Sequence, residues 1–175
     1  MSSQTAATSK IKSSVGRRSA ALADRIEKGA ALLAAFAEEL SEEEWRAPVS
    51  PTDRRSVGLI VHHVASMYPI EIEVARAIAS GKAVTDVTWD AVTELNAKHA
   101  HEHAEETKTT ALELLRRNSR EAAHAVRTLT DEELDRAAPF SLSFGAPVTA
   151  QFVIEDHALR HSWHHLAHIR KALSR

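Results

Sequence analysis

The stretch of residues 152–173 reads FVIEDHALRHSWHHLAHIRKAL. It contains neither Gly nor Pro, and its apolar residues recur with a period near 3.6, which predicts an amphipathic α-helix. It also holds five of the chain's eleven histidines: His157, His161, His164, His165 and His168. At about 100° per residue, all five fall within an arc of about 100° beside the apolar face. The predicted helix therefore carries a row of imidazoles along one side.

His161 and His165 are the two members of this row that lie closest to the apolar face. They are four residues apart, a spacing that places two side chains on adjacent turns and lets both rings bind one metal ion. The zinc-binding HExxH motif has the same spacing, but its glutamate is missing here, because the intervening residues are Ser162, Trp163 and His164. The alternative interpretation is a solvated helix face that is merely rich in histidine.

Three further helical regions are predicted upstream. Apolar residues at three- and four-residue steps predict helices at residues 22–40, at about 53–80 and at about 89–128. The apolar face of the third region changes near residues 106–110, where we expect a break. Four substantial helices and no convincing sheet predict an all-α protein built as a four-helix bundle.

Short segments between these helices predict extra helical turns. Ser41 with Glu44, and Thr130 with Glu133, have the three-residue spacing of a capping box. The loop at residues 139–147 alternates apolar and polar residues and is expected to cap one end of the core. Residues 1–13 are polar and lack an apolar period, so we expect a flexible N-terminal arm. Residues 14–175 are expected to form a single domain.

His63 lies at the middle of the apolar arc of the second predicted helix. A histidine at such a position is either a hydrogen-bonded core residue or a ligand. Bundles build metal sites from facing helices, so His63 together with His161 and His165 predicts a three-histidine site for a divalent ion. Its neighbour His62 is rotated by about 100° and is expected to lie off the apolar face.

Three polar residues share one face of the third helical region: Asn96, His99 and His103. A polar cluster is costly to bury unless it is hydrogen-bonded or faces a cavity. We therefore interpret these residues as contacts to a substrate or as partners of the metal ligands. The alternative is that His103, with His101, belongs to a solvated face.

The composition excludes several classes of protein. There are 22 Lys and Arg against 24 Asp and Glu, so a strongly basic surface for nucleic acid or anionic membrane is not indicated. The absence of cysteine removes disulfides, thiolate ligands and a cysteine nucleophile. The N-terminus lacks the apolar core of a signal peptide, and no run of residues reaches the length of a membrane span. A cytoplasmic location is expected.

Two segments resemble a known family. The sequences SVGLIVHHVA at residues 56–65 and HSWHHLAHI at residues 161–169 are similar to those of the DinB/YfiT-like superfamily of metal-binding four-helix bundles. The segment TWDAVTELNAKHA at residues 88–100 resembles actinobacterial members of the same group. The resemblance covers most of the chain beyond residue 13. It implies a DinB/YfiT-like bundle.

The resemblance also implies a site and a chemistry. The family's metal-binding triad, one histidine on the second helix and an HxxxH pair on the fourth, falls on His63, His161 and His165. A divalent ion such as zinc or nickel, a small-molecule substrate and a homodimer are implied. Related proteins include S-transferases and isomerases that depend on mycothiol, bacillithiol or glutathione. The adjacent His62 and His164 leave open a shift of the ligand set by one position.

The leading hypothesis is therefore an enzyme that transfers a low-molecular-weight thiol to a small electrophile at a three-histidine metal site. A metal-dependent hydrolase is the first alternative. A bundle that binds metal or forms a dimer without catalysis is the second, because a row of neutral histidines can also buffer metal or sense pH. The sequence shows no phosphate loop, nucleophile elbow or thiol-recognition motif.

Overall fold

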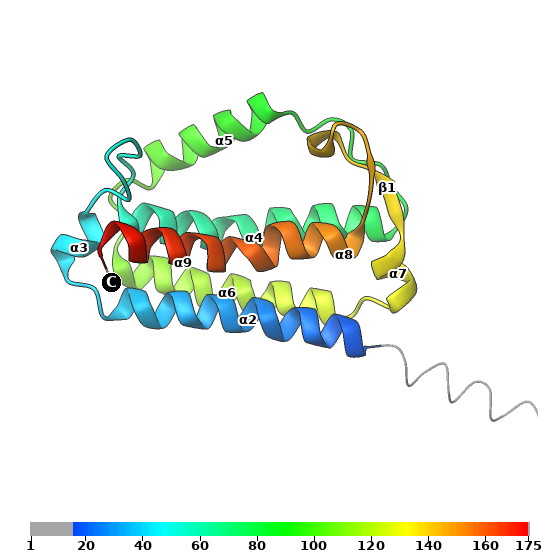
Figure 1. The fold of residues 1–175 in the computed structure, drawn as a ribbon, viewed down its shortest axis with the longest axis horizontal. Coiled ribbons are helices and arrows are strands. Elements are labelled where there is room, and N and C mark those ends of the chain that lie inside the picture. The colour runs from blue at the N-terminus through cyan, green and yellow to red at the C-terminus, as the bar shows by residue number, and fades with distance from the viewer. Residues whose placement is uncertain (1–15, 175) are drawn as a thin grey trace, which may run out of the picture.

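A computed structural model describes residues 16–174, and the arm expected at residues 1–13 lies outside this range. Within it, four long helices form the bundle that the sequence predicts (Figure 1). The first three are α2 (Arg17–Glu38), α4 (Val57–Ala79) and α6 (Lys108–Arg127). The fourth, here called the C-terminal helix, is a continuous run of α8 (Ala150–Val153), η2 (Ile154–Leu159) and α9 (Arg160–Ala172). The predicted all-α four-helix bundle is confirmed.

The order of the helices around the bundle differs from their order in the chain. Helix α2 packs on α6 and on the C-terminal helix, and α4 packs on the same two, so α2 and α4 lie diagonally opposite. Helix α5 (Trp89–Glu102) carries the chain back along the outside of the bundle, and α4 and α6 therefore run parallel (Figure 1). This arrangement places the histidine-bearing faces of α4 and the C-terminal helix next to each other.

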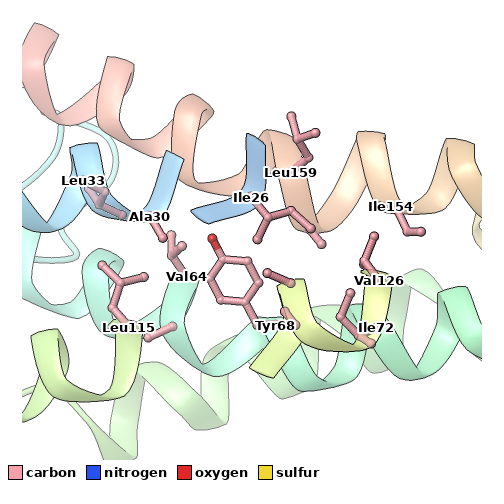
Figure 2. Close-up of a cluster of buried hydrophobic side chains, with 14 of the residues drawn as sticks. Ile26, Ala30, Leu33, Val64, Tyr68, Ile72, Leu115, Val126, Ile154 and Leu159 are labelled. Atoms are coloured by element: carbon pink, nitrogen blue, oxygen red, sulfur yellow. The ribbon is translucent and has the colours of Figure 1, made fainter. Parts of the chain in front are cut away.

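The core lies between the four helices and is apolar. Figure 2 shows Tyr68 of α4 among side chains from all four: Ile26, Ala30 and Leu33 of α2, Val64 and Ile72 of α4, Leu115 and Val126 of α6, and Ile154 and Leu159 of the C-terminal helix. Tyr68 is fully buried, and its hydroxyl lies 2.6 Å from Ser162 Oγ of α9. This buried hydrogen bond fixes α9 against α4 close to His161, because Ser162 is the next residue in the chain.

Helix termini are closed by serine and threonine side chains. Ser41 and Thr130 form the predicted capping boxes at the starts of α3 (Glu42–Arg46) and α7 (Asp131–Asp135). The expected break in the third helical region is also present, since Thr107 caps α6 and separates it from α5. These hydroxyls accept hydrogen bonds from backbone N–H groups that would otherwise have no partner within the helix.

Two local features were not predicted. The loop expected at residues 139–147 belongs to a small antiparallel hairpin, in which β1 (Ala137–Pro139) pairs with β2 (Pro147–Thr149) around η1 (Ser141–Ser143), a 3-10 turn. The expectation of no sheet is therefore wrong for these few residues. The C-terminal helix also contains a π-helical segment, η2, so a uniform rotation of 100° per residue does not hold across residues 154–159.

No helix within residues 16–174 combines the length and apolar character that crossing a membrane requires.

Candidate metal centre

The bundle brings His63, His161 and His165 together, and we call these residues the first triad. One ring nitrogen from each lies within 4.8 Å of the others. The ring of His63 is 5.0 Å from that of His161 and 5.8 Å from that of His165, measured between centroids. A tetrahedral ion bound at Zn–N distances of about 2.0–2.1 Å would separate two nitrogen ligands by about 3.3 Å. Small ring rotations are therefore enough for the three residues to hold one divalent ion.

Helical periodicity gives the first triad its shape. His161 and His165 lie on adjacent turns of α9, which is regular after the π-helical segment, and their ring centroids are 4.9 Å apart. His63 enters from α4 and is 8% exposed. Three imidazoles from two helices leave at least one coordination position for water or substrate, as in catalytic zinc sites.

A carboxylate from α4 supports the first triad, and the sequence analysis missed it. Nδ1 of His161 donates a hydrogen bond of 2.6 Å to Oε1 of Glu71, which is buried. The proton on Nδ1 leaves Nε2 of the neutral ring with a lone pair, as in the carboxylate–histidine–metal arrangements of metalloenzymes. The other oxygen, Oε2, is buried and has no hydrogen-bond partner among residues 16–174. A buried carboxylate oxygen without a partner is costly, which fits a site that also holds water or a ligand.

A small cavity of about 180 Å³ borders two members of the first triad, His161 and His165. Glu71 lines it as well. The other lining residues are polar or charged: Asp156, His157, Arg160 and His164. Arg160 is paired with Asp156 at 3.0 Å, so charges of both signs border the opening.

The sequence profile of the DinB superfamily matches residues 25–169 of the chain. The chain belongs to the DinB superfamily. In three dimensions, this DinB-superfamily protein is similar to YfiT from Bacillus subtilis, which is described as a probable metal-dependent hydrolase with an unusual four-helix bundle topology. The TM-score is 0.69 at 20% sequence identity, and the alignment covers 88% of this chain and 85% of YfiT. A comparison with curated proteins gives no match.

Burial keeps two members of the first triad neutral in this DinB-superfamily protein. Removal from water lowers the pKa of His63 to about 3 and that of His165 to about 2, because the interior disfavours the charged imidazolium. Both rings are therefore unprotonated at neutral pH. Unprotonated nitrogens are the form that binds metal, so the first triad needs no deprotonation of these two rings before an ion enters.

His164 lies beside the first triad without being part of it. Its side chain is exposed, and its ring lies 5.1 Å from that of His165 and 4.2 Å from that of His168. His157 is half-buried in the π-helical segment and contacts the ring of Phe140 at 5.9 Å. The row of five histidines thus divides into an inward pair and three residues outside the first triad.

The remaining predicted site residues lie next to the first triad. Asn96, His99 and His103 are half-buried on the side of α5 that faces α4, and the ring of His99 is 5.5 Å from that of His63. His99 and His103 contact the ring of His62, which is 4% exposed. His62 is buried although it was expected off the apolar face of its helix, because α5 packs over this side of α4.

Proposed function

We propose that this chain is a metal-dependent hydrolase acting on a small substrate, with a divalent ion held by His63, His161 and His165. The observation that carries the proposal is the convergence of these three imidazoles, two of which, His161 and His165, line a cavity together with Glu71. Such an ion would supply Lewis acidity and would lower the pKa of water at the site to about 7. The description of YfiT as a probable metal-dependent hydrolase supports the same reaction class.

The protein's own side chains have three tasks in this proposal. Glu71 holds the ring of His161 in one orientation and one tautomer through the hydrogen bond to Nδ1. Its second oxygen, Oε2, is available to accept a hydrogen bond from water in the cavity. The pair of Asp156 and Arg160 provides polar contacts for the substrate at the opening.

The size of the cavity favours a small substrate. Its volume of about 180 Å³ is below the range of roughly 300–1,000 Å³ that is typical of pockets for drug-sized ligands. It admits water and the reacting end of a substrate more readily than a bulky sugar thiol. We therefore prefer hydrolysis to the thiol transfer that was the leading hypothesis from the sequence. Thiol transfer stays a prediction.

A screen of the zinc- and nickel-loaded protein tests the proposal. The panel contains small esters, amides, phosphoesters and alkylating electrophiles, each with mycothiol, bacillithiol, glutathione or no thiol. We expect hydrolysis of at least one compound without thiol, and its loss in His165→Ala. Turnover that occurs only with a thiol would establish the transferase instead. If no compound reacts under any condition, the first triad binds metal without catalysis.

The role of Glu71 gives a separate prediction about affinity. Glu71→Gln keeps an acceptor for Nδ1 of His161 but removes the negative charge, so we expect zinc affinity at the first triad to fall by about tenfold, the lower end of the effect of such partners. Glu73→Gln is the matched control, because Glu73 lies two residues away on α4 and is exposed. Competition with a fluorescent zinc chelator measures both. Equal affinity in the two variants would mean that Glu71 does not support a zinc ligand.

A further inference from the structure

A second group of three histidines lies between α4 and α5. His62, His99 and His103, which we call the second triad, each offer a ring nitrogen within 4.8 Å of the other two. Nδ1 of His62 lies 2.9 Å from Nε2 of His99. The ring centroid of His103 is 4.2 Å from that of His62 and 4.8 Å from that of His99. In both triads the ring nitrogens therefore lie within 4.8 Å of one another.

A carboxylate orients the second triad in the same way as the first. Nδ1 of His103 lies 2.9 Å from Oε1 of Glu106, so its Nδ1 proton is held and Nε2 of a neutral ring carries the lone pair. Glu106 is itself fixed, because its backbone carbonyl accepts a hydrogen bond of 3.3 Å from Nε1 of Trp45. Trp45 is buried in the core beneath the connection between α5 and α6. The orientation of His103 is therefore determined by groups outside the second triad.

A buried polar atom on α5 provides a second, independent indication of a ligand. Oδ1 of Asn96 is buried and has no hydrogen-bond partner among the described residues. Asn96 lies three residues before His99 and seven before His103, so the three share one face of the helix. A buried amide oxygen without a partner is costly, and water or a hydrated ion next to the second triad would supply one.

We propose that His62, His99 and His103 bind a second divalent ion, separate from the ion of the first triad. The donor set is three imidazole nitrogens, which suits zinc, nickel or copper rather than magnesium or calcium. The second triad does not depend on the proposed hydrolase activity, since none of its members belongs to the first. The two sites are nevertheless neighbours, because His62 and His63 are consecutive and His99 contacts both rings.

The second ion would fasten α5 to the bundle. None of the fourteen residues of α5, all of which the structure describes, is fully buried. Its largest apolar side chains, Trp89 and Leu95, are 57% and 40% exposed. Ligands from both α4 and α5 let one ion join the two helices, so metal binding there stabilises α5 over the first triad.

Zinc stoichiometry after chelation, reloading and gel filtration tests the proposal. We expect about two zinc ions per chain in the parent, and one fewer in His99→Ala and in His103→Ala. His101→Ala is the matched control and should keep two, because His101 is an exposed residue of the same helix. His165→Ala should also lose one ion, from the first triad. Full parental zinc content in both His99→Ala and His103→Ala would overturn the second site.

Two further measurements separate a lost ligand from a damaged fold. Glu106→Gln leaves all three rings in place and should weaken one zinc site by about 10- to 100-fold, the effect of removing such a partner. Hydrogen exchange should show that zinc protects the amides of α5 in the parent and in His165→Ala, but not in His99→Ala. If the parent binds only one zinc ion, and this ion is lost in His99→Ala but kept in His165→Ala, then the second triad is a zinc site and the first triad is not. If zinc protects α5 equally in His99→Ala and in the parent, the second triad is not a zinc site.

Discussion

We expect His165→Ala and His63→Ala each to bind one divalent ion fewer per chain than the parent. Both rings belong to the first triad, and the ring nitrogens of its members lie within 4.8 Å of one another. Loss of a group that is hydrogen-bonded to a metal ligand weakens metal binding by up to roughly 100-fold. Loss of one of the three nitrogen ligands themselves should weaken zinc binding by more than this. Elemental analysis gives the loss of stoichiometry, and zinc titration of the chelator-treated protein gives the loss of affinity. Zinc content equal to the parent's in both variants would refute the ligand assignment.

His164→Ala is the control for this experiment. His164 neighbours His165 in the chain and in space, with ring centroids 5.1 Å apart, but its side chain is exposed. Its removal deletes the same chemical group from the same helix without touching the first triad. We expect unchanged zinc content. Loss of the ion in His164→Ala with retention in His165→Ala would show that the ligand set is shifted by one position.

Gly58→Ala should lower the free energy of unfolding by about 3 kcal/mol. A methyl group at this position would overlap the indole ring of Trp45, which is 4% exposed and would have to shift within the packed core. The expected cost lies between that of overpacking a core, about 1–3 kcal/mol, and that of losing a buried tryptophan, about 3–5 kcal/mol. Displacement of Trp45 also removes its hydrogen bond to Glu106, so zinc binding at the second triad should weaken as well.

Gly29→Ala provides the matched comparison in denaturant titrations. A methyl group there would also meet a tryptophan, since Nε1 of Trp163 lies 2.6 Å from the added carbon. Trp163 is 38% exposed, however, and can turn toward solvent. Replacing glycine by alanine within a helix stabilises it by about 0.5–1 kcal/mol, which offsets the cost of moving Trp163. We therefore expect a free energy of unfolding within about 1 kcal/mol of the parent's. Equal stability of the two variants would contradict the position of Trp45.

The sequence predicted the helices well because their signals are local. Apolar steps of three and four residues located the long helices, and the capping boxes at Ser41 and Thr130 located two short ones. The hairpin of β1 and β2 escaped prediction because each strand has only three residues, too few to establish an alternating pattern. The π-helical segment leaves no compositional mark in the sequence.

Patterns within single helices were enough to select the histidines of the first triad. His161 and His165 are one turn apart on one helix and His63 lies on the apolar face of another, and the structure brings the three together. Glu71 was missed because its partner His161 is ninety positions away in the sequence, although a charged residue three positions after Tyr68 on the apolar face was a usable signal. The burial of His62 was missed because it depends on where α5 crosses α4, which is a property of the tertiary fold.

The diagonal placement of α2 and α4 has a consequence for the nascent chain. Of the four long helices, α2 comes first in the chain and α4 second, but α2 packs mainly on α6 and on the C-terminal helix. As α2 leaves the ribosome, its apolar face must wait for residues that begin at Lys108 and Ala150. Contacts between such distant segments form slowly, and exposed apolar surface attracts chaperones and other unfinished chains. The bundle can therefore close only after its C-terminal helix, with two of the three histidines of the first triad, has been synthesised.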